Sequence, residues 1–269
     1  MIKNYDRFVT EQFDDFYKDF ENSKKRLKLF TRFNKIDAEV TDTNFTLPQP
    51  KKKFQPKIKN YKKTTMVGHL MIYHSAIIKI KNLIRDGIYG DLKFIEFFRR
   101  NFGKIRSNET SFMSFTPHDF SIADFLTFES KKSSFKCIKN NFSYYRNKNC
   151  YDMGNAKFII NNKECYFNYS WISPEKTRKI NLYFDKGIIV FDDLKSWDEK
   201  LLLIKSNKNN IIHSERDDIN RNYLPINSST EPLEDEIKNF MNSVIDSKEV
   251  KFTSIKKCIN IYKNILLAN

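Results

Sequence analysis

A short stretch in the middle of the sequence, FMSFTPHDFSIADFL at 112–126, contains a side chain well suited to proton transfer. His118 stands between Pro117 and Asp119 in a chain that has only four histidines. A free imidazole has a pKa of about 6.5, so it gains and loses a proton close to neutral pH. His118 is therefore a candidate general base.

The same triplet also has a purely structural interpretation. Thr116 can cap a helix, Pro117 suits the first helical position, and Asp119 can return a capping-box hydrogen bond. The apolar residues that follow predict a helix from His118 to Phe128. Spacing alone favours a residue at a helix start over a catalytic histidine.

The other candidate residues are weaker. The four cysteines form no C-x-x-C pair, so we expect reduced thiols and no metal site. Asp192 and Asp193 lack a spaced partner for acid–base catalysis, and Lys200 is expected to be a solvated charge. We interpret the remaining polar and aromatic candidates as structural or as sheet packing: His69, His74, Tyr169 and Trp171.

The composition predicts a globular protein. Hydrophobic residues make up 40% of the 269 positions, with 25 Phe and 13 Tyr. Apolar runs are too short for a membrane span, and the N-terminus lacks a signal-peptide pattern, so we expect a cytoplasmic protein without a membrane partner.

The net charge of +15 raises the question of nucleic-acid binding. The lysines are spread along the whole chain, and the one dense basic run, at 48–63, is interrupted by prolines as linkers often are. A nucleic-acid partner is therefore not expected.

Three segments follow from these patterns. Residues 1–47 form a helical N-terminal segment, since phenylalanines recur at three- and four-residue steps from Arg7 to Ile36. Residues 48–63 are the basic linker. Residues 64–269 form an α+β domain.

Strand patterns dominate this domain between Asp91 and Ile204. Short turns, at Asn161-Asn162 and at 185–187, predict one large, mostly antiparallel sheet. Two closing helices should cover one sheet face. With the helix that begins at His118, the expected helices are Ser75–Arg85, His118–Phe128, Leu233–Ile245 and Ser254–Leu267.

Several ordered motifs from Met66 onward resemble one enzyme family. MVGHLMIYHSAIIKIKNLIRDGIYGDLKFIEFFRRNFGKIR, then SFTPHDFSIADFL, YSWISPEKTRKINLYFDKGIIVFDD and EPLEDEIKNFMNSVI, are similar to the glucose-fructose oxidoreductase and inositol dehydrogenase family (Gfo/Idh/MocA). The resemblance is greatest to members that oxidise nucleotide sugars such as UDP-N-acetylglucosamine at C3.

The resemblance implies a site and a cofactor. In that family an open antiparallel sheet carries the substrate site and usually the oligomer interface, and a Rossmann domain holds NAD or NADP. His118 matches the histidine that resembles a general base. Asn101, Lys104 and Arg106 would stand near the sugar or its phosphates, where arginine suits bidentate contacts.

The chain departs from the family before Thr64. Residues 1–65 contain no glycine, whereas a Rossmann domain needs a glycine-rich turn for the pyrophosphate. The family's Glu-Lys-Pro motif is also missing. We therefore expect no cofactor on the isolated chain.

Three functions remain open. The chain is a substrate and oligomerisation domain of a nucleotide-sugar oxidoreductase that is inactive alone, or an active sugar dehydrogenase completed by a separate Rossmann chain, or a non-enzymatic assembly or binding protein that uses the sheet face. A homo-oligomer through the sheet fits all three.

Overall fold

One sheet of eight strands organises the part of the chain that the computed structural model describes, residues 64–103, 109–127, 135–143, 151–206, 219–226, 231–250 and 252–268. All of these residues fall within one compact unit. The strands are β1 (Leu92–Phe102), β2 (Phe135–Ser143), β3 (Met153–Ile160), β4 (Lys163–Ser170), β5 (Ile172–Phe184), β6 (Gly187–Asp192), β7 (Leu201–Ser206) and β8 (Ile219–Tyr223).

The strand order is β2-β3-β4-β1-β5-β6-β7-β8. Six neighbouring pairs are antiparallel, and β1 and β4 are parallel. The predicted mostly antiparallel α+β fold is confirmed. The parallel pair was not predicted, and neither was β8, which lies beyond Ile204. A long crossover, here the whole segment from α4 to β3, is what a parallel pair requires.

Both predicted hairpin turns are present. Asn161 and Asn162 have φ values of 49° and 65°, which asparagine tolerates better than most residues. Asp185 and Lys186 join β5 to β6, and Gly187 follows. A Cβ at Gly187 would lie 2.9 Å from the carbonyl oxygen of Ile204, so the close approach of β7 requires glycine there.

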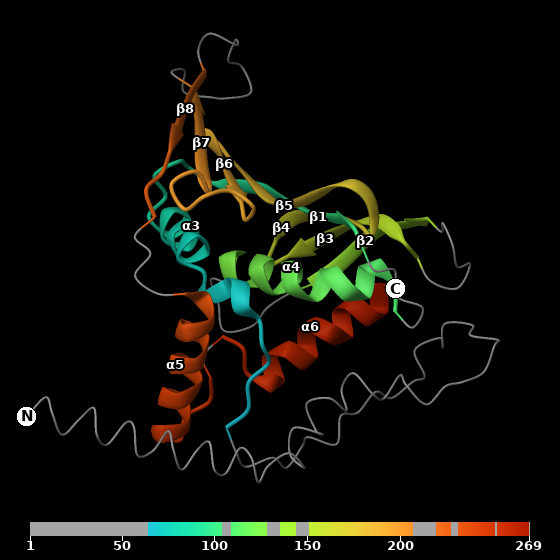
Figure 1. Ribbon diagram of the computed structural model, residues 1–269, viewed down its shortest axis with the longest axis vertical. Helices are drawn as coiled ribbons and strands as arrows, with labels where there is room; N and C mark the ends of the chain where they lie inside the picture. The colour runs from blue at the N-terminus through green and yellow to red at the C-terminus, as the bar shows by residue number, and fades with distance from the viewer. Residues whose placement is uncertain are drawn as a thin grey trace, which may run out of the picture. The chain divides into compact units, whose positions relative to one another are not determined.

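The helices lie on one side of the sheet (Figure 1). They are the short 3₁₀ helix η1 (Leu70–Tyr73), α3 (Ser75–Arg85), α4 (Ser111–Thr127), α5 (Pro232–Ile245) and α6 (Ile255–Ala268). Helix α4 packs on β1, β3 and β4, α6 packs on α4 and β2, and α5 packs on η1. The prediction that the two closing helices cover the sheet is wrong for α5, because α4 takes the central place.

The predicted start of α4 is also wrong. The helix begins at Ser111, and Thr110 caps it by accepting a hydrogen bond at Oγ1 from the amide of Met113, at 3.1 Å. Pro117 therefore lies inside the helix. Burial outweighs the poor local propensity of proline here, since Phe112, Phe120 and Leu126 are all fully enclosed.

Alternation along the strands separates the two sheet faces. Ile95 and Phe97 of β1 are buried beneath the helices, and the ring of Phe97 stacks on Phe167 at 4.9 Å between centroids. Full burial of a phenylalanine side chain stabilises a fold by roughly 1.5–3 kcal/mol. Phe94, on the opposite face, stacks on Tyr183 at 4.1 Å.

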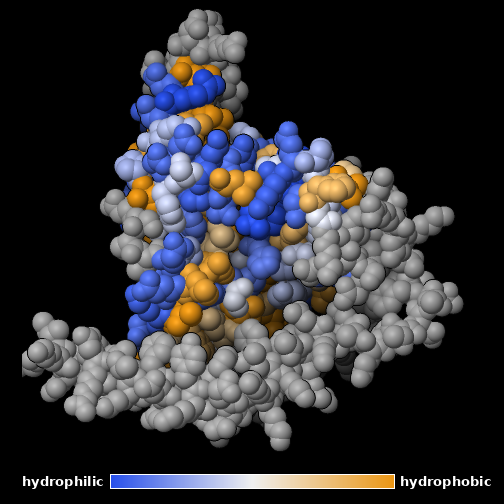
Figure 2. Space-filling model, in the orientation of Figure 1, coloured by the Kyte–Doolittle hydropathy of each residue, from blue (hydrophilic) through white to orange (hydrophobic). Residues whose placement is uncertain are grey.

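On the face seen in Figure 2, hydrophobic and hydrophilic residues lie side by side. Among the described helices, none has both the length and the hydropathy to cross a membrane. The predicted helical segment 1–47 and linker 48–63 lie outside the described residues.

Candidate functional site

His118 lies on the exposed side of the N-terminal half of α4. Its ring meets the ring of His69 edge to face, with 6.2 Å between centroids. Although His118 is exposed, partial loss of water and then the charge of Arg99 lower its pKa; Asp119 opposes this and Arg178 adds to it. Imidazole with a lowered pKa is neutral near pH 7, so it can accept a proton.

Arg99 and Asp119 form an ion pair beside His118. Nε and Nη2 of Arg99 both donate to Oδ1 of Asp119, at 2.9 and 2.7 Å. Asp119 had been expected to cap a helix start, but the helix begins eight residues earlier and its carboxylate binds β1 instead. The pair holds α4 against the sheet at the level of His118.

A second set of charges enters from β5 and from the loop after β6. Nη1 of Arg178 lies 3.4 Å from Oδ2 of Asp193. Lys200 lies 3.6 Å from Oδ1 of the same carboxylate and donates to its backbone carbonyl at 2.7 Å. The expectation of a solvated Lys200 is wrong, because its side chain is buried against Asp193 and Trp197.

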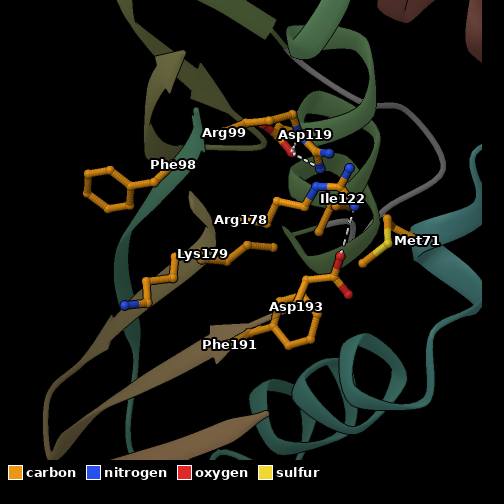
Figure 3. Close-up of a pocket in the computed structure, with 10 residues that line it drawn as sticks. Met71, Phe98, Arg99, Asp119, Ile122, Arg178, Lys179, Phe191 and Asp193 are labelled. Atoms are coloured by element: carbon orange, nitrogen blue, oxygen red, sulfur yellow. Dashed lines mark hydrogen bonds and ion pairs between the residues drawn. The ribbon is translucent and has the colours of Figure 1, made fainter. Parts of the chain in front are cut away.

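Arg99, Asp119, Arg178 and Asp193 line a narrow cleft between α4 and the sheet (Figure 3). The side chains of Arg99 and Arg178 both reach toward α4, whereas Lys179 extends away from it. The volume of the cleft, about 10 Å³, is that of roughly one water molecule. Met71 and Ile122 supply an apolar wall.

The two remaining described histidines are buried, as expected for structural residues. His74 caps α3, since its Nδ1 accepts the amide of Ala76 at 3.0 Å, and its ring stacks on Trp197. His69 is only 3% exposed, and neither of its ring nitrogens has a hydrogen-bond partner among the described residues. Burial lowers the pKa of each to about 4.

The predicted substrate residues have different outcomes. Asn101 is the next-to-last residue of β1, where the pairing with β5 shifts register between Arg100 and Phe102. Its Oδ1 is buried without a partner among the described residues. Lys104 and Arg106 lie outside the described residues, so their proximity to His118 stays a prediction.

The minor candidates fit packing roles. Tyr169 and Trp171 are buried, against Phe112 and Phe115 respectively. Asp192 pairs with Lys179 at 3.4 Å while Asp193 pairs with other cations. No group of three or more His, Cys, Asp or Glu side chains in the described ranges could hold a metal ion.

Sequence reasoning missed Arg99 and Arg178 as site residues. Arg99 has the same alternation phase as the buried Ile95 and Phe97, and Arg178 has the phase of the buried Ile180 and Leu182. An arginine in the buried phase of a strand needs a partner or a site. That phase was the signal in the sequence.

The described residues do not fit the pyrophosphate of a dinucleotide. All six glycines of the chain lie in the described ranges. Gly87 and Gly90 follow the end of α3, and no glycine stands in the turn immediately before α3, α4, α5 or α6. A pyrophosphate cradle needs such a turn at a helix N-terminus.

No protein-family model and no curated protein matches the sequence. Solved structures do match. UDP-N-acetylglucosamine 3-dehydrogenase GnnA from Acidithiobacillus ferrooxidans has a TM-score of 0.56 and 17% identity, over 75% of this chain and 59% of that one. A Desulfitobacterium hafniense protein described as an NADPH-dependent oxidoreductase has a TM-score of 0.64 and 16% identity, over 78% and 63%.

A third similar structure is KijD10, a 3-ketoreductase from Actinomadura kijaniata solved with TDP-benzene and NADP. Its TM-score is 0.58 and its identity 9%, over 77% of this chain and 60% of KijD10. At such identities the likeness shows the fold alone. The chain thus has the fold of a group of oxidoreductases, and it spans about 60% of their length.

Proposed function

We propose that residues 64–269 are the substrate and oligomerisation domain of a nucleotide-sugar oxidoreductase of the Gfo/Idh/MocA type. The observation that carries this proposal is His118, which lies exposed beside two arginines within a fold similar to GnnA and KijD10. Those proteins act on or bind nucleotide-linked groups. The sequence resemblance from Met66 onward supports the same family.

His118 is the proposed general base. A neutral imidazole on the surface of α4 can take the proton of a sugar hydroxyl without first losing one of its own. The Arg99–Asp119 pair fixes the turn of α4 that carries His118, because Asp119 is the next residue. Asn101, Lys104 and Arg106 remain the proposed substrate contacts.

We propose that this chain does not complete the oxidation alone. Oxidation of a sugar hydroxyl needs an electron acceptor, which NAD or NADP supplies in this class of enzyme. The described glycines do not fit a dinucleotide, and residues 1–65 have none.

The open face of the sheet is the proposed homo-oligomer interface. Phe94, Tyr166 and Tyr183 form an aromatic cluster there, with centroid distances of 4.1 and 5.8 Å from Phe94. Phe102 at the end of β1 is 71% exposed. Aromatic side chains of this kind are enriched in protein interfaces.

A dehydrogenase completed by a separate cofactor-binding chain is the second candidate, and α5 favours it. Leu233, Ile237 and Val244 follow one side of this helix at steps of four and seven residues, and each is about half exposed. Hydrophobic side chains lie beside hydrophilic ones in this region of the molecule (Figure 2). An apolar helix stripe of this kind suits a protein partner.

Calorimetric titration of the full chain tests the main proposal. We expect saturable binding of UDP-N-acetylglucosamine, weakened in His118→Ala and unchanged in Asn242→Ala, an exposed control on α5. No saturable binding of NAD(H) or NADP(H) is expected at physiological salt.

Three results would count against the proposal. Absence of UDP-sugar binding would contradict the proposal that these residues form a substrate domain. Formation of reduced cofactor from NAD⁺ or NADP⁺ and the UDP-sugar would show that the chain is active alone. Light scattering that detects only monomer would contradict the proposed interface on the sheet.

A further inference from the structure

Asp193, which lines the cleft, forms ion pairs with two cations. Its carboxylate lies 3.4 Å from Arg178 and 3.6 Å from Lys200, and Lys200 is the more buried of the two. Arg99 has its own carboxylate in Asp119. Arg178 and Lys200 therefore share the single carboxylate of Asp193, so Arg178 lacks a full counter-charge.

The geometry of Arg178 leaves its guanidinium available. Its side chain is 46% exposed, and the one ion pair that it makes among the described residues, at 3.4 Å, is longer than a strong charge-assisted hydrogen bond. Figure 3 shows it reaching across the cleft toward α4, on the same side as Arg99. A planar guanidinium in this position suits two parallel bonds to an oxyanion.

The size of the cleft limits what can enter. A volume of about 10 Å³ admits one oxygen atom and no more. A carboxylate or phosphate could place one oxygen between the arginines while the rest of the group stays at the mouth.

We propose that Arg178, supported by Arg99, binds an oxyanion group of the ligand directly beside His118. This deepens the proposed function and rests on it, because it assigns a negative charge to the part of the substrate next to the reacting hydroxyl. The bound anion also offsets the field of both arginines at His118, so ligand binding makes this imidazole a stronger base.

Nuclear magnetic resonance of the histidine side chains tests the proposal with inorganic phosphate as the probe. The chain has four histidines, and His118→Asn assigns the signal. Phosphate should shift the His118 resonance saturably and raise its pKa. Arg178→Gln should weaken phosphate binding about tenfold or more, the loss expected for a hydrogen bond to a charged group. Arg178→Lys should be intermediate.

Lys176→Gln is the matched control. Lys176 is exposed on the same strand, and this substitution removes the same charge as Arg178→Gln. It should leave the phosphate response unchanged. No saturable shift of His118, or an equal loss in Arg178→Gln and Lys176→Gln with both variants folded by circular dichroism, overturns the proposal.

UDP and UDP-glucuronate distinguish the two sources of the oxyanion. An Arg178-dependent shift with UDP alone identifies the diphosphate, and one that needs the uronate identifies a sugar carboxylate. The readout does not involve oxidation or UDP-N-acetylglucosamine, so this inference and the proposed function can fail separately.

Discussion

Helix α4 carries two buried aspartates five residues apart, and they do different work. Asp119 binds Arg99 at the edge of the cleft next to His118. Asp124 is 0% exposed, lies 2.9 Å from Lys257 of α6, and accepts a hydrogen bond from Asn161 of the β3–β4 turn at 3.0 Å. The C-terminal half of the helix is fixed to two other elements, and the N-terminal half carries the proposed general base beside the cleft.

Contacts at both ends of α4 hold His118 in place although the helix contains a proline. The C-terminal half of α4 is tied to the β3–β4 turn, where Asn161 donates to both Asp124 and Thr127. The N-terminal half is held by Ser111, whose amide and hydroxyl both donate to the carbonyl oxygen of Tyr151, and by the Arg99–Asp119 pair next to His118.

The largest effect should come from Asp124→Ala. This change removes a fully buried carboxylate that binds both Lys257 and Asn161, and breaking a buried ion pair costs about 3 kcal/mol or more. Urea unfolding followed by circular dichroism measures it. The exposed pair Glu234–Lys238 on α5 is the control, because Glu234→Ala should change stability by less than about 0.5 kcal/mol. Similar losses in the two variants would contradict an anchoring role for Asp124.

Mild acid should act at the His118 end of the helix. Burial lowers the pKa of His69 to about 4, with further contributions from His118 and Lys257. As pH falls below about 6.5, His69 becomes protonated in the unfolded chain but stays neutral in the folded protein. The free energy of unfolding therefore decreases between pH 6.5 and 4, by on the order of 2 kcal/mol at pH 5.

Urea midpoints at pH 7 and pH 5 measure this loss. His74 adds a loss of the same sign, because burial also lowers its pKa to about 4. His69→Asn should therefore reduce the pH dependence without removing it. An unchanged pH profile in this variant would exclude His69 as a source.

Asn161→Ala tests the turn that fixes the anchored end. The variant loses hydrogen bonds to Asp124 and Thr127 and places alanine at a φ of 49°. A loss of about 1–2 kcal/mol is expected. Thermal unfolding of both variants measures the effect. Asn162→Gly, at a φ of 65°, should stay within about 0.5 kcal/mol of the parent. Equal losses would point to a general effect of the turn.

Asp119→Asn should have the smallest effect on stability, about 1 kcal/mol, because asparagine keeps a side-chain oxygen that can accept a hydrogen bond from Arg99. Its effect on the site should be clearer. Asp119 raises the pKa of His118, so the variant should lower that pKa in a histidine resonance titration. A higher pKa would mean that the carboxylate does not act on His118 electrostatically.

The sequence was informative wherever local chemistry and packing agree. Helix α3 has the predicted bounds, since His74, Arg85 and Gly87 give it a cap, a cation in its last turn and a stop. The hairpin at Asn161 was equally readable. The start of α4 was not, because Thr116-Pro117 is a good local start signal and burial of Phe112 overrides it.

The site was harder to predict than the fold. His118 was identified by its residue type and by family resemblance. Arg178 is brought to His118 by the register of β5 against β1, where Arg99 faces Arg178 across the strand pair. That pairing joins positions nearly eighty residues apart, and no local pattern specifies it. The phase of each arginine indicated a partner but could not identify one.

The position of β1 in the sheet has a consequence for how the chain is made. Phe94 of this central strand pairs with both Glu164 and Tyr183. Both partners come later in the chain, so β1 is synthesised before either neighbouring strand exists. Helix α3 and the β3–β4 and β5–β6 hairpins can form from nearby residues, whereas β1 waits for distant ones, which makes folding slow. We expect its aromatic sequence, LKFIEFFRRNF, to be the segment of a nascent chain most in need of a chaperone.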